Sequence, residues 1–348
     1  MPFWRMMLAA VGVQLVGLGA AGALAGLGGV GVFGPFWSGW LDLVNSLAPI
    51  WFLLCLAGSA GVGLALGPRR ARTAVLAVGA AGMIVAGVPV MAEVAAGWLG
   101  PRAARSPDGA LKVLTFNAFD YSFMPSQGVE MILSSGADVV AVQETASIRP
   151  FLPQMRSVYP FQSPCEDKAC SVIILAKRQP RALSVEYLPG SLLGPLPEGS
   201  GPGAGDVVVA RIDFTAPDGR PATLISTHLN WPVPPTNYQL QQSVLEHYVA
   251  GLPKDRLILV GDFNTTPWTF AMRRQDAALR PLRRLTRALP TWPAYVPRLY
   301  IPLPVQFLPI DHIYVGRGWR PARLARLAHA ASDHLPVEVE LSPTRPRS

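Results

Sequence analysis

The chain has 348 residues, 50% of them hydrophobic, and a formal net charge of +8 at pH 7. Its length exceeds that of one compact domain, and its mean hydropathy of +0.29 excludes an ordinary soluble protein. Charged side chains are unevenly spread, because residues 1–100 hold only Arg5, Asp42, Arg69, Arg70, Arg72 and Glu93. This break in composition predicts that the first hundred residues lie in lipid and the remainder in water.

Three apolar stretches occupy the N-terminal part, at about 7–33, 43–67 and 73–98. Each reaches the roughly 20 residues that a helix needs to cross a bilayer. The first is too long for the apolar region of a cleavable signal peptide, and two more follow it. We therefore expect residues 1–100 to form a membrane anchor with three transmembrane helices. Their many Gly and Ala residues favour close helix packing in a compact bundle.

The short basic segments predict the orientation of this anchor. Arg5 precedes the first stretch, and the turn between the second and third contains Arg69, Arg70 and Arg72. Short loops rich in Lys and Arg stay in the cytoplasm, so the part after the third stretch is expected outside it. Arg102 and Arg105 oppose this rule, but long domains are translocated largely regardless of charge. The expected location is a bacterial inner membrane with an extracytoplasmic domain.

Residues 101–110 are rich in Pro, Arg, Ser and Gly and are interpreted as a linker. Cys165 and Cys170 follow further along and are five residues apart. Outside the cytoplasm a disulfide closing this small loop is the favoured interpretation, and free thiols are the alternative. A zinc site needs more ligands at suitable spacing than the neighbouring sequence offers.

Apolar runs after the linker alternate between strand-like and helix-like patterns. Long irregular segments are expected at 188–206, which is dense in Pro and Gly, and at 290–309, which is rich in prolines and aromatic residues. Many strands with interspersed helices indicate an α/β domain built on sheets. The predicted strands are 112–116, 138–143, 171–176, 207–214, 223–227, 257–260, 310–315 and 335–341, and the predicted helices are 129–134 and 238–250.

Polar residues stand where the predicted strands end. Each of them alone is common in surface turns, since Gly, Asp and Asn are turn formers. Their ordered recurrence at strand ends is typical of catalytic groups held by a rigid scaffold. Carboxylate and amide oxygens suit Mg²⁺ or Mn²⁺, and a carboxylate beside an imidazole suits acid–base chemistry. The set consists of Asn117, Glu144, His228, Asp262, Asn264, Asp311, Asp333 and His334.

The motifs around these residues resemble the endonuclease/exonuclease/phosphatase superfamily, which includes DNase I. The resemblance covers about residues 110–341 and implies a domain over 111–341. It implies a four-layer α/β sandwich, in which two packed β-sheets are flanked by helices and the site lies at one end of the sheets. The motifs are Thr115-Phe116-Asn117, Val142-Gln143-Glu144-Thr145, Thr227-His228-Leu229, Gly261-Asp262-Phe263-Asn264, Ile310-Asp311-His312-Ile313 and Ser332-Asp333-His334-Leu335-Pro336.

The same resemblance implies the residues of a metal site for Mg²⁺ or Mn²⁺. Glu144 would be the principal ligand, with Asn117 close by and Asp333 completing the sphere through water. Many relatives carry a second polar residue two places after the first Asn, where this chain has Phe119. Either Asp120 replaces that residue with a shifted backbone or the contact is absent, which leaves one metal or two open.

Catalytic roles are also implied. Asp262 and Asn264 would orient the attacking water and a phosphate oxygen, and His228 would donate to the phosphate oxygens. His334 would be the catalytic imidazole, acting as base or charge stabiliser, with Asp311 fixing its tautomer. A divalent ion would offset the negative charge of the phosphate as charge develops.

The resulting functional hypothesis is a membrane-tethered, metal-dependent hydrolase of a phosphate ester, in particular a phosphodiester. A lipid headgroup is one substrate class, because the tether raises the local concentration of lipid. Nucleic acid is the alternative, motivated by the basic stretch from Arg273 to Arg287. An inactive membrane scaffold is the third hypothesis, which the complete set of polar residues argues against. The bilayer is the expected partner, and no stable protein partner is predicted.

Overall fold

The computed structural model describes residues 2–31, 34–65, 69–99, 109–164, 170–196, 203, 205–296 and 301–344. Most of the predicted linker, residues 101–108, and Cys165 lie outside these residues. Cys170 is buried and disulfide-bonded. The chain forms two compact units. Unit 1 comprises Met1–Trp98, Pro234–Thr236 and Thr266–Arg274, and unit 2 comprises Leu99–Val233, Asn237–Thr265 and Gln275–Ser348.

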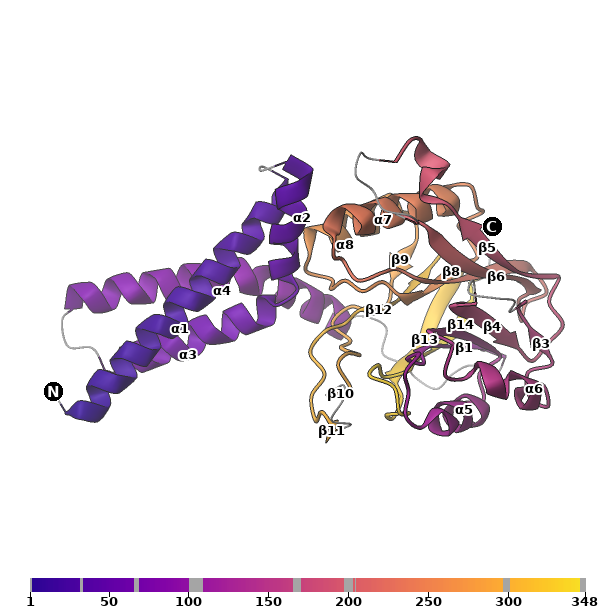
Figure 1. The fold of residues 1–348 in the computed structure, drawn as a ribbon, viewed down its shortest axis with the longest axis horizontal. Helices are drawn as coiled ribbons and strands as arrows, with labels where there is room; N and C mark the ends of the chain where they lie inside the picture. Colours follow the sequence, from indigo (N-terminus) through magenta and orange to yellow (C-terminus); the bar gives the residue numbers. More distant parts are fainter. Residues whose placement is uncertain are drawn as a thin grey trace. The chain divides into compact units, whose positions relative to one another are not determined.

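Unit 1 is built mainly of apolar helices (Figure 1). Three of its segments are long and apolar enough to cross a membrane, at Phe3–Val30, Ala48–Ala65 and Arg70–Trp98. The predicted three apolar N-terminal helices are thus confirmed. The predicted stretch 43–67 begins within a separate shorter helix, which ends at Asn45. The helices are α1 (Phe3–Leu27), η1 (Gly28–Val30), α2 (Gly34–Asn45), α3 (Ala48–Ala65) and α4 (Arg69–Leu99).

Glycines allow α1 and α3 to approach closely. A Cβ atom placed on Gly12 would lie 2.9 Å from the carbonyl oxygen of Gly58, and one on Gly58 would lie 2.6 Å from the carbonyl oxygen of Gly12. A Cβ atom placed on Gly19 would lie 2.7 Å from the Cys55 sulfur. In lipid, where no hydrophobic effect drives helices together, such backbone proximity supplies the packing contacts. The small residues seen in the sequence therefore form this helix interface.

Asp42, on α2, has a defined role within unit 1. Its carboxylate is buried and accepts hydrogen bonds of 2.8 Å from the backbone N–H groups of Phe270 and Ala271. These groups belong to the first turn of α8 (Phe270–Ala278), whose N–H donors have no partner within the helix. Asp42 therefore serves as a capping acid for that turn.

Unit 2 contains two six-stranded sheets and one short hairpin. The first sheet has the order β13 (Trp319–Arg326), β14 (Val337–Pro343), β1 (Leu111–Asn117), β2 (Val139–Gln143), β4 (Val172–Ala176) and β3 (Phe161–Gln162). The second has the order β5 (Ala182–Leu188), β6 (Val207–Thr215), β7 (Pro221–His228), β8 (Leu257–Asp262), β12 (Asp311–Val315) and β9 (Arg283–Arg284). The hairpin pairs β10 (Tyr295–Val296) with β11 (Ile301–Pro302).

The strand directions bring the ends of several strands to one edge of the two sheets. β1 and β2 are parallel, with Asn117 beside Gln143, and β7 and β8 are parallel, with His228 beside Asp262. β12 is antiparallel to β8, which places Asp311 opposite Asp262. β14 is likewise antiparallel to β1, so the segment before it approaches the end of β1. Polar residues from six chain segments can therefore converge there.

Alternating side chains of the central strands fill two cores. One face of β1 and β2, including Val113 and Val139, packs toward Leu224 and Ile258 of the second sheet. The opposite face, including Phe116, packs against the helical side of the first sheet. This side is covered by α5 (Pro125–Ser134), η2 (Arg149–Phe151) and α6 (Leu152–Met155), and α7 (Pro235–Ala250) lies on the outer side of the second sheet (Figure 1). The predicted four-layer sandwich is confirmed.

Six strands of the described residues were not predicted: β5 and β13, which are edge strands, and the two-residue strands β3, β9, β10 and β11. The β13 sequence, WRPARLAR, alternates basic and apolar residues, and edge strands use charge to avoid pairing with other chains. The segment expected to be irregular at 290–309 contains the β10–β11 hairpin, and the segment at 188–206 contains the short helix η4 (Gly190–Leu193).

Candidate active site

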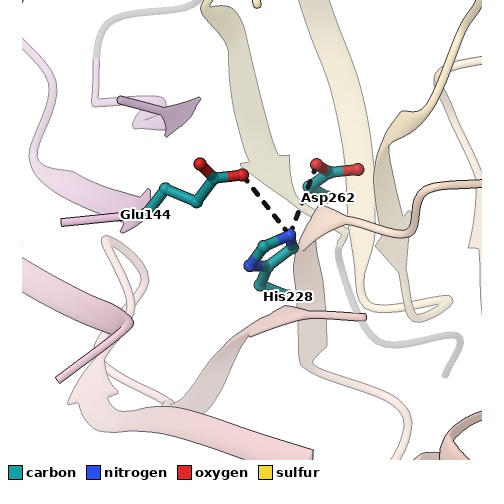
Figure 2. A group of neighbouring side chains, drawn as sticks. All are labelled: Glu144, His228 and Asp262. Atoms are coloured by element: carbon teal, nitrogen blue, oxygen red, sulfur yellow. Dashed lines mark ion pairs between the residues drawn. The ribbon is translucent and has the colours of Figure 1, made fainter. Parts of the chain in front are cut away.

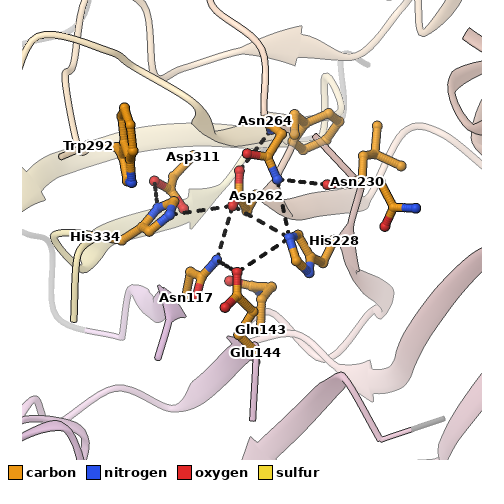
Figure 3. A network of polar contacts seen from close by, with 12 residues as sticks. Asn117, Gln143, Glu144, His228, Asn230, Asp262, Asn264, Trp292, Asp311 and His334 are labelled. Carbon is orange, nitrogen blue, oxygen red and sulfur yellow. Dashed lines mark hydrogen bonds and ion pairs between the residues drawn. The ribbon is translucent and has the colours of Figure 1, made fainter. Parts of the chain in front are cut away.

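Asp262, the last residue of β8, is 1% exposed and lies at the centre of the polar cluster (Figure 3). The preceding Gly261 has a φ of 145°, and a Cβ atom there would overlap the carbonyl oxygen of Thr227. Glycine at this position therefore allows β8 to lie against β7, with Asp262 beside His228. The Oδ1 atom of Asp262 accepts the backbone N–H of Asn264 at 2.8 Å, which fixes the carboxylate.

Glu144, Asn117 and His228 surround one oxygen of Asp262. The Asn117 amide nitrogen donates to Glu144 Oε1 at 2.8 Å and to Asp262 Oδ2 at 3.0 Å. His228 Nε2 lies 3.7 Å from the same two oxygens, as Figure 2 shows. The ends of β2, β7 and β8 thus bring the carboxylates of Glu144 and Asp262 and the imidazole of His228 within 4.8 Å of one another. This group is the first cluster.

The second cluster shares Asp262 and adds Asp311 and His334. His334 Nδ1 lies 2.8 Å from Asp311 Oδ2, and Nε2 lies 3.6 Å from Asp262 Oδ2. The Ser332 hydroxyl donates to the carbonyl oxygen of Asn117 at 2.7 Å and accepts the backbone N–H of His334 at 3.0 Å. Ser332 therefore joins the His334 loop to the end of β1.

The electrostatics of the second cluster favour a protonated His334. Burial by itself would lower the pKa of His334, but the carboxylates of Asp311 and Asp262 outweigh it and raise that pKa to about 10. Burial raises the pKa of Asp262 to about 8, against the lowering effect of His334. The arrangement therefore holds an imidazolium between two acids, one of which resists ionisation.

His228 has the opposite tendency. Burial lowers its pKa, although the charge of Glu144 opposes this. The Asn264 amide nitrogen donates to the carbonyl oxygen of Leu229 at 2.8 Å and lies 3.2 Å from His228 Nε2. With this amide orientation Nε2 accepts a hydrogen bond, and the proton of the neutral ring is on Nδ1.

Asp333 is held by Trp292, whose indole Nε1 donates to Asp333 Oδ2 at 3.0 Å. The other oxygen, Oδ1, is buried and has no hydrogen-bond partner among the described residues. Burial raises the pKa of Asp333. A buried carboxylate oxygen without a partner is costly unless a cation or water compensates it.

Backbone strain is concentrated in the site loops. Four non-glycine residues in the described part of the chain have a positive φ: Phe119 (58°), Glu144 (48°), Asn264 (48°) and Ala331 (54°). Each is a site residue or lies within two positions of one. Such conformations are costly, and they persist where the surrounding structure enforces them. The site is therefore assembled by tight turns directly after strands and before β14.

The turn after Asn117 shows how the chain departs from the expected pattern at Phe119. The Phe119 N–H donates to Asn117 Oδ1 at 3.0 Å, and the Asp120 N–H lies 3.3 Å from Glu144 Oε2. The Asp120 carboxylate accepts the backbone N–H of Ala146 at 2.8 Å and belongs to neither cluster. Its backbone, rather than its side chain, reaches Glu144.

The residues present fit a divalent cation bound through oxygen. Glu144 and Asp262 offer carboxylate oxygens in the first cluster, and the Oδ1 atom of Asp333 has no hydrogen-bond partner among the described residues. The raised pKa of Asp262 indicates that its negative charge is insufficiently compensated. A hard cation such as Mg²⁺ or Mn²⁺ prefers these ligands and would supply the missing positive charge.

The comparison with known families decides the identity of this domain. A profile of the Endonuclease/Exonuclease/phosphatase family matches residues 127–334, which is more than half of the chain. The chain belongs to the endonuclease/exonuclease/phosphatase family. This membership confirms the resemblance inferred from the strand-end motifs. None of the curated proteins compared matches the sequence.

Solved structures share the fold of this family domain at low sequence identity. A conserved protein of unknown function from Enterococcus faecalis V583 is 18% identical (TM-score 0.50, 67% of this chain, 100% of that chain). D. rerio TDP2, in complex with a single-strand DNA product, is 16% identical (TM-score 0.53, 68% and 100%). The human Nocturnin catalytic domain, with a bound sulfate anion, is 16% identical (TM-score 0.52, 69% and 97%). These likenesses show the fold.

Seven of the eight predicted site residues lie in the network around Asp262 (Figure 3), and the eighth, Asp333, directly precedes His334 and accepts the indole N–H of Trp292. Trp292, Ser332 and Gln143 were not predicted to belong to it. Gln143 is buried and donates to Ser226 at 2.8 Å across the two sheets. A polar residue at an inward position of an apolar strand is a signal for such a contact, whereas the Trp292 bond joins segments 41 residues apart and leaves no local pattern.

Proposed function

We propose that this protein is a membrane-tethered phosphodiesterase that requires Mg²⁺ or Mn²⁺. The observation that carries the proposal is the position of Asp262, which belongs to both clusters. The first cluster contains the carboxylate of Glu144, and the second contains the His334 imidazolium. The first suits a metal ion, and the second suits a developing negative charge. The catalytic domain would span residues 111–341, after an anchor at 1–100 and a linker at 101–110.

Each side of the site has a distinct task in this mechanism. Glu144, Asn117 and Asp333 would hold the divalent ion, which when bound polarises the phosphate and offsets its charge. His334, kept protonated by Asp311, donates from Nε2 to a phosphate oxygen as negative charge develops. The raised pKa of His334 favours this role over that of a general base.

Asp262 and Asn264 act on the attacking water. Asp262 lies between the two clusters, so its carboxylate can orient a water molecule and accept its proton. The Asn264 amide, fixed by the Leu229 carbonyl, provides a donor beside it. His228 would donate to a phosphate oxygen only after its proton moves to Nε2. That change removes the hydrogen bond that Nε2 accepts from the Asn264 amide.

The membrane part of the proposal is supported by the three apolar segments of unit 1. The basic residues around Arg5 and Arg69–Arg72 favour an extracytoplasmic catalytic domain in a bacterial inner membrane. A periplasm-dependent reporter fused after residue 341 tests this orientation, and an inactive fusion in intact cells would contradict it.

The nuclease alternative loses part of the support that the basic stretch from Arg273 to Arg287 gave it. Arg284 is buried and forms a bidentate pair with Asp276, at 3.0 and 2.8 Å, and Arg283 donates to the carbonyl oxygen of Trp319. Arg287 lies 3.8 Å from Asp276. These three arginines of the 273–287 stretch contact other parts of the fold, whereas Arg273, Arg274 and Arg280 are exposed. The complete site also disfavours an inactive scaffold.

The test uses the full chain purified in detergent, with bis-p-nitrophenyl phosphate as a soluble phosphodiester. We expect hydrolysis with Mg²⁺ or Mn²⁺, loss with a chelator, and loss in Glu144→Gln. Glu130→Gln, an exposed acid on α5, is the matched control. Absence of hydrolysis of any phosphodiester with either metal would overturn the proposal.

A further inference from the structure

Three loops next to the site expose large apolar side chains. The loop after β1 exposes Tyr121 and Phe123, and the loop after β7 exposes Trp231 and Val233. The segment from β11 onward exposes Val305, which is 68% accessible, and Tyr121 reaches 81%. These five residues are called the apolar rim. Clustered exposed apolar groups on a folded domain mark a binding surface more often than chance.

Ring contacts join the first two loops to residues 292–295. Trp231 contacts Trp292 with ring centroids 5.4 Å apart, and Phe123 contacts Tyr295 at 6.0 Å. Residues 292–295 therefore contact both of these loops, and Tyr295 also pairs with Pro302 at the start of the third. Trp292 also donates to Asp333. The apolar rim consequently borders the residues proposed to act on the phosphate.

The rim loops carry no basic residue. Residues 118–124, 229–236 and 301–309 contain neither Lys nor Arg, and Arg298, which precedes the third of these ranges, lies outside the described residues. Binding of nucleic acid draws much of its affinity from Lys and Arg that neutralise successive phosphates. The rim instead offers aromatic and aliphatic surface beside a site for one phosphate.

We propose that the apolar rim binds the hydrocarbon part of a lipid phosphodiester whose phosphate occupies the site around Asp262. This inference rests on the proposed function and specifies its substrate class. The three apolar segments of the same chain favour a lipid occupant, since a membrane anchor keeps the domain where lipid is abundant. Apolar contact lowers KM by adding burial that a headgroup alone does not provide.

The experiment compares substrates that differ only in hydrocarbon. The full chain in nanodiscs is assayed with headgroup-labelled dihexanoyl phosphatidylcholine, phosphatidylglycerol and phosphatidylinositol, and with the deacylated glycerophosphodiester of each. We expect the acylated form of at least one pair to have the higher kcat/KM. The double variant Trp231→Ser, Val233→Ser is expected to reduce this preference about tenfold.

Matched controls separate the rim from general surface effects. Leu192→Ser and Leu193→Ser alter exposed apolar residues of η4, which carries no site residue, and should leave the preference as in the wild type. Val305→Ser tests the third loop and should reduce the preference. Circular dichroism and thermal unfolding verify that each exposed-residue variant is folded.

The outcomes distinguish this inference from the function on which it depends. If deacylated diesters or bis-p-nitrophenyl phosphate are hydrolysed but no acylated substrate is preferred, the rim proposal is wrong and the phosphodiesterase stands. A preference that survives the Trp231→Ser, Val233→Ser change also overturns it. The proposal is also overturned if the Trp231→Ser, Val233→Ser variant loses more activity toward a single-stranded oligonucleotide than toward the lipid.

Discussion

Unit 1 and unit 2 bury their polar and small residues for different reasons. In unit 1, Gly12 and Gly58 have no side chain, and this lets the backbones of α1 and α3 lie close together. In unit 2, Asp262, Asp311 and His334 are buried at the edge where the strand ends meet, and burying these charged groups is electrostatically costly. Close packing of small residues therefore joins α1 and α3 in unit 1, whereas hydrogen bonds and ion pairs among buried polar groups join the site residues of unit 2. Substitutions that enlarge a side chain should therefore affect mainly the stability of unit 1, and substitutions that remove a charge should affect mainly the activity of unit 2.

The largest effect is expected at Asp262, because it belongs to both clusters. Asp262→Asn keeps the size of the side chain but removes the proton acceptor and the negative charge. We expect kcat toward bis-p-nitrophenyl phosphate to fall by about 10³-fold or more. Asp218→Asn, which changes a surface carboxylate paired with Arg256, is the control. Retention of more than a tenth of the activity in Asp262→Asn would remove this residue from the centre of the mechanism.

The next largest effect is a pH dependence of the free energy of unfolding, caused by His312, a buried histidine of unit 2. Its Nδ1 lies 3.1 Å from the Thr286 hydroxyl and its Nε2 lies 3.0 Å from the Thr265 carbonyl oxygen. Burial, and then the charge of Arg284, lowers the pKa of His312 to about 3. The unfolded chain binds a proton near pH 6.5, so the neutral ring stabilises the fold above that pH and this contribution is lost as pH falls toward 3.

The measurement is the free energy of unfolding between pH 7 and pH 4. His312 should contribute a slope of about 1.4 kcal/mol per pH unit below pH 6.5. His312→Gln, which keeps polar atoms but does not titrate, is expected to be less stable at pH 7 and to have a shallower slope. An unchanged slope would show that His312 is already protonated in the folded protein.

Much of this organisation follows from the sequence, because strands and their polar ends are local patterns. Glu144 and Asp262 follow apolar runs, and they were predicted from the ordered recurrence of polar residues at strand ends together with the family resemblance of their motifs. The positive φ of Glu144 and the bond from Trp292 to Asp333 depend on contacts between distant segments. β13 was missed because a basic edge strand lacks the apolar signal of a central one. Local patterns thus predict the members of the site, and tertiary contacts determine its geometry.

An intermediate effect tests shape in unit 1. Gly58→Leu would place a side chain against the backbone of Gly12, and we expect a loss of about 1–3 kcal/mol in stability. Gly17→Leu is the matched control on α1, because nothing lies within 4 Å of a Cβ atom there. Thermal unfolding of the full chain in detergent measures both. Equal melting temperatures for the two variants would contradict close packing of α1 and α3.

The smallest effect is expected at Trp292, which touches the site through a single hydrogen bond. Trp292→Phe removes the donor to Asp333 Oδ2 but keeps an aromatic ring beside Trp231. Losing one hydrogen bond to a charged group should raise the Mn²⁺ concentration for half-maximal activity by about tenfold. A change confined to kcat, with the same metal requirement, would mean that Trp292 does not position Asp333 for the ion.

The most direct measurement is Mn²⁺ binding to the full chain, followed by electron paramagnetic resonance of the free ion. The proposed binding of one cation by Glu144, Asn117 and Asp333 predicts saturable binding in the wild type that weakens by at least about tenfold in Glu144→Gln. Glu130→Gln should bind as the wild type does. Indistinguishable Mn²⁺ binding by the wild type and Glu144→Gln would contradict a metal centre at the end of these sheets.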